Sequence, residues 1–316
     1  MNRALKRISY SLITITFMLG LLYVYMDKEA LELNADSRAK LDGQFIRLDM
    51  GNVHYQLEGD KNAETVVLVH GFSSPLYIYN PTFDYLKKHY HVVRFDYYGR
   101  GYSDRIDDSY EIALYVEQID HLLNALQIKD PVNIVGLSMG GAVVTHFTNK
   151  YPDRVKQVSL IAPLFHTPNR ADLKAVQVPG LGEYLTTTVM IPKMISGAEE
   201  FLHDPKSVPN WAEEFGEQTQ YKGFGRALLR TARFLAGKNF ESEYKKLGQL
   251  GKPVQLIWGE NDQVIPISDA EKIRELVPKM EFHRIAQAGH LPHLEQKARV
   301  NPILHDFMRK TTRPAL

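Results

Sequence analysis

The sequence of 316 residues contains no cysteine. Disulfide bonds, thiolate nucleophiles and metal sites built on cysteine are therefore excluded. The absence does not indicate a compartment, because a chain without cysteine is compatible with oxidising and reducing surroundings alike. Net charge is also almost missing, since 38 Lys and Arg stand against 37 Asp and Glu, for a formal charge of +1. Such a balance gives no reason to expect a nucleic acid or another polyanion as partner.

Internal repeats and low-complexity segments are absent too, but one long apolar run is present. It covers residues 8–26 and follows the basic residues Arg3, Lys6 and Arg7. As a helix it would span roughly 28 Å, which is close to the hydrocarbon thickness of a bilayer. We predict that residues 1–28 are an uncleaved signal anchor, with the basic flank in the cytoplasm and the remaining chain exported to the periplasmic or extracellular side. The alternative is a cleaved signal peptide and secretion.

Strand and helix patterns alternate over most of the remaining chain. FIRLDMGNVHYQLEG predicts a β-hairpin. Short apolar runs that resemble buried strands follow, interleaved with helical patterns: TVVLVHG, HVVRFD, PVNIVGLS, VKQVSLIAP, PVQLIWGEND and MEFHRIAQAGH. In the helical pattern of residues 108–126, Asp108 and Glu111 are predicted to form a capping box. The alternation predicts an α/β fold, with a mostly parallel sheet covered by helices on both faces.

The alternation stops between residues 164 and 250. This stretch has no strand run, but it contains several prolines and helix-like pieces such as FGRALLRTARFLAG. We interpret it as a helical cap inserted into one α/β core, which comprises residues 43–163 and 251–312. The polar residues 29–42 are predicted to be a tether between the anchor and the core.

The segment GLSMG, residues 136–140, directly follows one strand pattern and directly precedes a helical pattern. Gly-x-Ser-x-Gly in this setting indicates a nucleophile elbow, in which the turn is so tight that side chains at the flanking positions would clash. The elbow presents the serine hydroxyl beside the first N–H groups of the helix. A serine that only caps the helix is the alternative. Ser138 is therefore the candidate nucleophile.

A serine hydroxyl needs a base within hydrogen-bond distance, and position must select this base from 12 histidines. His290 follows the last strand pattern, at the sheet edge where Ser138 is expected, and we predict it to be the base. His293 is the second candidate. A carboxylate that orients the base is expected at the tip of another strand, where Asp262 is the first choice and Glu260 the second.

Two backbone N–H groups must bind the negative charge that develops on a substrate carbonyl oxygen. Met139, directly after the candidate nucleophile, supplies one of them. The second is assigned to Phe72, in the loop that leaves the strand pattern TVVLVHG. His70 in the same loop has the chemistry of a base or a metal ligand, but we interpret it as a residue that holds the loop in place.

Five segments together resemble the α/β-hydrolase superfamily: HGF at 70–72, FDYYGRGYSD at 95–104, GLSMGG at 136–141, GENDQVIP at 259–266 and GHLPHLE at 289–295. The order serine, aspartate, histidine along the chain is also that of this superfamily. The resemblance extends over about residues 45–308 and has the character of lid-bearing esterases and monoacylglycerol lipases, some of which carry an N-terminal membrane anchor. It implies an eight-stranded sheet, a cap after the sixth strand, no cofactor or metal, and a structural role for Asp96, Gly99 and Gly101.

The sequence thus predicts a serine hydrolase that cleaves carboxylic esters through an acyl-enzyme intermediate. The cap is rich in apolar residues and lacks a basic cluster for a phosphate, which favours monoacyl esters of short to medium chain, monoacylglycerols included. Haloalkane dehalogenases and epoxide hydrolases resemble this scaffold but have an aspartate at the elbow, so Ser138 argues against both. Carbon–carbon bond hydrolases and perhydrolases remain alternatives, as does a non-catalytic receptor that binds a ligand in the pocket.

Overall fold

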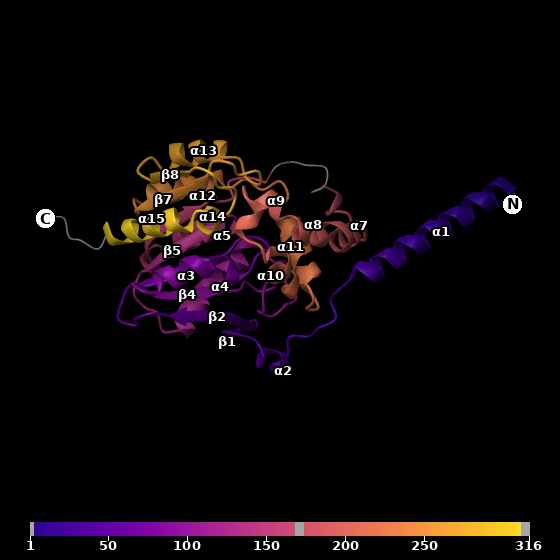
Figure 1. Cartoon of the computed structure of the whole chain (residues 1–316), viewed down its shortest axis with the longest axis horizontal. Helices are drawn as coiled ribbons and strands as arrows, with labels where there is room; N and C mark the ends of the chain where they lie inside the picture. The colour runs from indigo at the N-terminus through magenta and orange to yellow at the C-terminus, as the bar shows by residue number, and fades with distance from the viewer. Residues whose placement is uncertain (1–2, 168–173, 311–316) are drawn as a thin grey trace.

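The computed structural model of the chain describes residues 3–167 and 174–310. Its centre is an eight-stranded sheet in the order β1-β2-β4-β3-β5-β6-β7-β8, with helices on both faces (Figure 1). The strands are β1 (Gln44–Arg47), β2 (Asn52–Glu58), β3 (Thr65–Val69), β4 (His91–Phe95), β5 (Val132–Leu137), β6 (Val155–Ile161), β7 (Val254–Gly259) and β8 (Glu281–Ile285). β1 and β2 form the predicted antiparallel hairpin, and β3 to β8 are parallel to one another. The predicted α/β fold and eight-stranded sheet are confirmed.

Most of the parallel strands are largely apolar because they contribute to two hydrophobic cores. In β3, Val67 and Val69 face one core, and Val66 and Leu68 face the other. This is the two-residue period of a strand that is buried on both faces. The first core is closed by α4 (Ile112–Ala125), α5 (Met139–Lys150), α12 (Glu241–Gln249) and α13 (Ser268–Leu276), and the second by α3 (Asn80–Leu86) and α15 (Lys297–Lys310).

The start of α4 differs from the prediction. Its N-cap is Glu111, whose side chain makes no capping hydrogen bond, so the predicted capping box of Asp108 and Glu111 is wrong. Tyr110 explains the difference, because its φ of +58° is incompatible with a helix that starts earlier. The buried Tyr110 side chain donates its hydroxyl proton to the Ile106 carbonyl at 2.7 Å, which stabilises this turn.

Between β6 and β7, the regular elements of the described residues are all helical. They are α7 (Leu181–Leu185), η3 (Thr186–Met190), α8 (Ile191–Ser196), α9 (Ala198–Phe201), η4 (Pro205–Ser207), α10 (Trp211–Gln218), α11 (Phe224–Leu235) and α12. Of these, α12 packs against the core helices α5 and α13 and extends their layer. We use the name cap for the elements from α7 to α11, which lie together at one end of the sheet (Figure 1).

The N-terminal helix α1 (Arg3–Met26) projects away from the rest of the molecule (Figure 1). Its residues from Lys6 to Met26 form a helix that is long and apolar enough to cross a membrane, and none of it is buried inside the structure. A signal anchor and a signal peptide both fit this helix. The chain then passes through the short helix α2 (Ala35–Arg38) to reach β1.

Candidate active site

Ser138 lies at the turn from β5 to α5, with φ +55° and ψ −121°. A non-glycine residue in this region costs about 1–3 kcal/mol, so the surrounding structure must hold it there. Glycines permit the turn, because a Cβ on Gly136 would lie 2.5 Å from the Gly140 carbonyl oxygen and one on Gly140 would lie 2.4 Å from that of His70. Among the residues that the structure describes, the Ser138 side chain makes no capping hydrogen bond to α5. Its hydroxyl is thus not used as a helix cap.

Asp262 and His290 meet at the carboxyl-terminal edge of the sheet, after β7 and β8 respectively. His290 Nδ1 lies 2.8 Å from Asp262 Oδ2, and both side chains are almost fully buried. Asp262 Oδ1 accepts the N–H groups of Val264 and Ile265, each at 2.9 Å. This arrangement fixes the carboxylate and makes Nδ1 the protonated nitrogen of the imidazole, which leaves Nε2 as the proton acceptor.

The two alternative residues are used elsewhere. His293 is fully buried, and its Nε2 donates to the Ile78 carbonyl at 3.0 Å. Burial lowers the pKa of His293 to about 3. Glu260 is partly exposed and pairs with Arg284 at 2.8 Å. Neither His293 nor Glu260 takes part in the pair formed by His290 and Asp262.

The loop after β3 approaches the elbow closely. A Cβ on Gly71 would lie 3.3 Å from the Ser138 Cβ, so a glycine here leaves room for the serine. His70 holds the loop, as expected from the sequence, because Nδ1 donates to the Gly71 carbonyl at 2.9 Å and Nε2 accepts the Tyr97 N–H at 3.0 Å. Burial lowers the pKa of His70 to about 4, so the imidazole is neutral near pH 7. Phe72 follows in this loop, and Met139 begins α5, where first-turn N–H groups have no acceptor within the helix.

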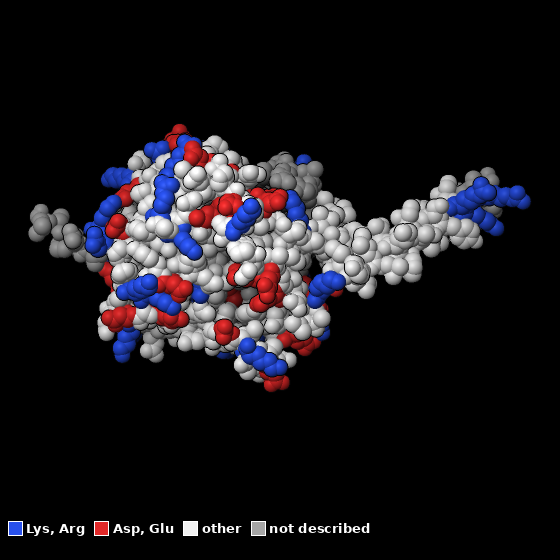
Figure 2. Space-filling view, in the orientation of Figure 1, with Lys and Arg blue, Asp and Glu red and all other residues white. Residues whose placement is uncertain are grey.

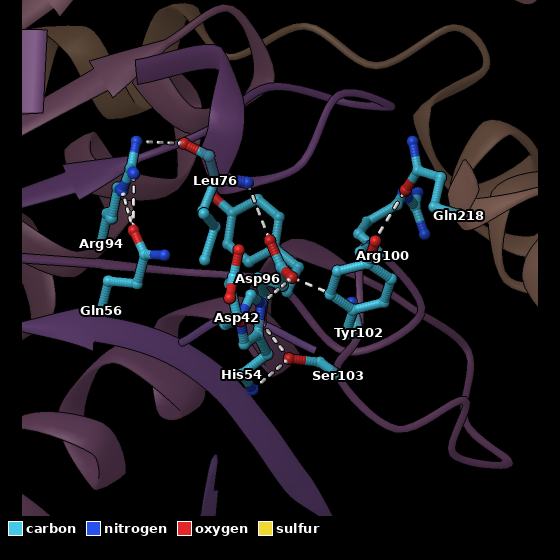
Figure 3. A network of polar contacts seen from close by, with 12 residues as sticks. Asp42, His54, Gln56, Leu76, Arg94, Asp96, Arg100, Tyr102, Ser103 and Gln218 are labelled. Carbon is cyan, nitrogen blue, oxygen red and sulfur yellow. Dashed lines mark hydrogen bonds and ion pairs between the residues drawn. The ribbon is translucent and has the colours of Figure 1, made fainter. Parts of the chain in front are cut away.

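Asp96 connects this loop to the chain that follows β4 (Figure 3). Its Oδ1 accepts the Leu76 N–H at 2.8 Å, and its Oδ2 accepts the Tyr102 N–H at 2.9 Å and lies 2.6 Å from His54 Nδ1. Burial by itself would raise the pKa of Asp96, but the charge and the hydrogen bond of His54 outweigh it, so the pKa is lowered. A Cβ on Gly101 would lie 1.9 Å from Asp96 Oδ2. The resemblance to α/β-hydrolases implies a structural role for Asp96 and Gly101, and these contacts agree with it.

Arg100 ties the same region to the cap. Its side chain is fully buried, and Nε donates to the Phe72 carbonyl at 2.6 Å, while Nη2 donates to Thr231 Oγ1 on α11 at 2.9 Å. The position of the Phe72 loop therefore depends on a cap helix. Sequence reasoning did not identify this link.

Two further residues beside His290 were not predicted. The Phe201 carbonyl, at the end of α9, accepts the His290 N–H at 2.8 Å, and the two rings lie 6.4 Å apart. Glu295 accepts the Gly289 N–H at 2.7 Å. Burial raises the pKa of Glu295. Glu295 is part of the segment GHLPHLE, but nothing in that segment shows that its carboxylate turns back toward the loop. Among the described residues, no three His, Asp or Glu side chains are grouped in a way that could hold a metal ion.

The alpha/beta hydrolase fold family matches residues 64–297 of this chain. The protein belongs to the α/β-hydrolase family. The matched region contains Ser138, Asp262 and His290 and most of the sheet and cap. Bovine monoacylglycerol lipase ABHD6 is 25% identical over 254 residues, which are 77% of this chain and 75% of that protein.

Solved structures of other hydrolases have the same fold. A mutant of the meta-cleavage product hydrolase CumD aligns with a TM-score of 0.70 and 25% identity, over 85% of this chain and 98% of CumD. A bacterial membrane phospholipase A aligns with a TM-score of 0.72 over 99% of this chain and 100% of that one, at 19% identity. The second alignment includes the region of α1, whereas the first leaves part of this chain uncovered. At 19% identity the likeness concerns the fold alone.

Proposed function

We propose that this α/β-hydrolase cleaves carboxylic esters of apolar acyl groups, with Ser138 as nucleophile, His290 as base and Asp262 as the acid that orients it. The observation that carries the proposal is the 2.8 Å contact of Asp262 with His290 at the sheet edge to which the Ser138 elbow belongs. An imidazole held in this tautomer accepts the proton of a serine hydroxyl through Nε2.

In the proposed reaction, Ser138 Oγ attacks the ester carbonyl carbon while its proton passes to His290 Nε2. The N–H groups of Phe72 and Met139 bind the oxyanion of the tetrahedral intermediate. The intermediate collapses, and the alcohol leaves with the proton from His290. Water then attacks the acyl-serine, again with His290 as base, and releases the carboxylic acid.

The cap supports an apolar acyl group as substrate. Phe201, whose ring lies beside His290, stacks on Trp211 at a centroid distance of 5.2 Å, and Trp211 stacks on Phe215 at 6.0 Å. The cap side chain in contact with the base is therefore aromatic and has aromatic neighbours. Each methylene of an acyl chain that is buried against the partly exposed Phe201 ring contributes about 0.8 kcal/mol. Monoacyl esters of short to medium chain, including monoacylglycerols, are the proposed substrates. The likeness to monoacylglycerol lipase ABHD6 agrees with this choice.

We further propose that α1 remains uncleaved and anchors the protein in a membrane, with the hydrolase domain on the exported side. The fit of α1 to a bilayer and the basic residues at its start support the anchor. Protease protection of a C-terminal tag tests the topology. In spheroplasts, a tag that is digested only after their membrane is opened would place the domain in the cytoplasm.

The reaction is tested with the full-length protein in detergent, by labelling with a fluorophosphonate and by assays on p-nitrophenyl esters of increasing chain length. Labelling at Ser138 and kcat/KM that rises with chain length to a maximum are expected. The likeness to CumD makes carbon–carbon bond cleavage the second candidate. Turnover of a vinylogous diketone without any ester hydrolysis would establish that activity in place of the first.

A further inference from the structure

The segment that follows α1 is joined to the cap. Leu31 and Tyr221 form a parallel β-bridge, in which the Leu31 N–H donates to the Gln220 carbonyl and the Lys222 N–H donates to the Leu31 carbonyl, both at 2.9 Å. The side chains of Glu32 and Lys222 form an ion pair at 2.7 Å. The predicted tether thus begins with a stretch whose course is set by the cap.

Glu29 makes the most specific of these contacts, because it caps the N-terminus of α11. Its two carboxylate oxygens accept the N–H groups of Gly223 and Gly225, each at 2.6 Å. Gly223 is the N-cap of α11 and has no side chain that could satisfy these donors. A carboxylate at a helix N-terminus is also favoured by the helix dipole. A residue only three positions beyond the end of α1 thereby stabilises a cap helix.

A second contact fixes the position of the cap along the axis of α1. The rings of Tyr23 and Tyr184 are stacked at a centroid distance of 6.3 Å, and α1 packs against η3. Tyr23 is three residues before the end of α1, which is about 4.5 Å along the helix axis. When α1 spans a bilayer, Tyr184 lies at the boundary between the acyl chains and the headgroups, where tyrosine is favoured.

Three large apolar side chains lie exposed on α7, on η3 and in the turn just before α7, close in the sequence to Tyr184. Val178, Leu181 and Val189 are 49%, 43% and 52% exposed, and we call them the cap face. The opposite side of α7 and η3 is buried, since Gly182 and Thr186 face inward. Figure 2 shows charged side chains at the far end of α1 and few of them where α1 joins the cap.

Two charged residues close in sequence to the cap face are paired within the cap. Glu183 is paired with Arg233 at 2.9 Å, and Lys193 is paired with Glu200 at 3.0 Å. Pairing of this kind lowers the cost of bringing the cap face to a lipid surface. The cap face includes Val189 of η3, the element against which α1 packs, which indicates the same environment for both.

We propose that the cap face is a membrane-contact surface, which the Glu29 cap of α11 and the Tyr23–Tyr184 contact hold in the interfacial zone of the bilayer that α1 crosses. Apolar side chains of surface-bound elements are buried about 5–10 Å into the boundary of headgroups and acyl chains. The proposal rests on the anchor part of the proposed function. It places the cap, with Phe201 beside His290, at the surface where lipid-derived esters leave the bilayer.

The absence of native cysteine allows single-cysteine variants to be labelled at one position with the fluorophore NBD. Full-length Val178→Cys, Leu181→Cys and Val189→Cys are reconstituted into phosphatidylcholine vesicles with and without a lipid that carries a doxyl quencher near its headgroup. Met50→Cys and Leu250→Cys are the matched controls, because these residues are apolar and 44% and 37% exposed on the core. Leu12→Cys reports on the anchor. The cap-face labels should lose most of their emission to the quencher, and the control labels very little.

Quenching at Leu12 without quenching on the cap face overturns the proposal and leaves the anchor intact. A cap face that is shielded from water but not quenched by lipid also overturns it, because another protein surface, such as a second copy, would then cover these residues. Absence of quenching at Leu12 removes the anchor and the proposal with it. In Glu29→Ala, quenching at Val189 should fall while that at Leu12 persists. Unchanged quenching at Val189 would contradict the role of Glu29.

Discussion

Glu295 Oε1 accepts the N–H of Gly289, the residue before His290, at a distance of 2.7 Å. The other carboxylate oxygen, Oε2, accepts the N–H groups of His203 and Asp204 in the cap, at 2.6 and 3.0 Å. One side chain thus joins the loop of the proposed base to the chain that follows α9. The cap and the His290 loop are held as one unit, so the cap takes part in positioning the base.

Replacement of Glu295 by alanine should lower kcat by about 10- to 100-fold with little change in KM, because small displacements of a reacting group have effects of this size. Glu295→Gln keeps a single accepting oxygen and should retain more activity than Glu295→Ala. The neighbouring Gln296→Ala, which loses only a hydrogen bond to the Gln287 carbonyl, is the control. Steady-state kinetics of folded protein on a p-nitrophenyl ester provide the measurement. Wild-type kcat in Glu295→Ala would show that the carboxylate has no positioning role.

The proposed triad predicts that Ser138→Ala, His290→Ala and Asp262→Asn each lose nearly all ester hydrolysis, with a fall of about 10⁴-fold or more in kcat. Glu260→Gln is the matched control. This carboxylate lies two residues before Asp262 but pairs with Arg284 on the surface, so its loss should change kcat very little. Activity that survives in His290→Ala but disappears in a folded His293→Ala would move the base to His293.

Two buried histidines predict how stability depends on pH. Burial lowers the pKa of His293 to about 3 and that of His70 to about 4, below the ordinary value near 6.5. As the pH falls below 6.5, the unfolded chain binds protons that the folded chain does not, so stability decreases down to about pH 4. Between pH 7 and pH 5 each histidine contributes about 2 kcal/mol to this loss.

His293→Gln tests this dependence, because glutamine can donate to the Ile78 carbonyl but does not titrate. The free energy of unfolding of the variant should be lower than that of the wild type at pH 7. Between pH 7 and pH 5 it should fall by fewer kcal/mol than that of the wild type. Urea unfolding at both pH values provides the measurement, with His121→Gln, a partly exposed histidine, as control. Equal losses of stability in the wild type and in His293→Gln would refute the low pKa of His293.

Gly140→Ala should strongly destabilise the protein, because the added Cβ would lie 2.4 Å from the carbonyl oxygens of both Val69 and His70. These are backbone atoms that cannot move without disturbing β3 and the loop of Phe72. Gly216→Ala in α10 is the control, since no atom lies within 4 Å of an added Cβ and alanine favours a helix by about 0.5–1 kcal/mol. The melting temperature should therefore fall in Gly140→Ala and rise in Gly216→Ala. A normal melting temperature in Gly140→Ala would falsify the steric explanation of this glycine.

Local patterns in the sequence were sufficient for the sheet and for the edge at which the proposed site lies. A parallel strand buried on both faces is largely apolar, so most of the runs that became β3 to β8 were recognisable without any partner. The carboxyl ends of such strands meet at one edge. For this reason Ser138, Asp262 and His290 could be assigned to a common edge although they are far apart in the chain.

Only the tertiary structure decided which distant partner each side chain meets. His290 and His293 are three residues apart with similar surroundings in the sequence, yet one meets Asp262 and the other is buried against Ile78. Glu29 caps a helix whose first residues lie 194 and 196 positions away. The periodicity of a sequence reports which face of an element is buried, but it contains no information on which distant donor a carboxylate will meet. That depends on how the cap packs on the sheet, and therefore on the whole fold.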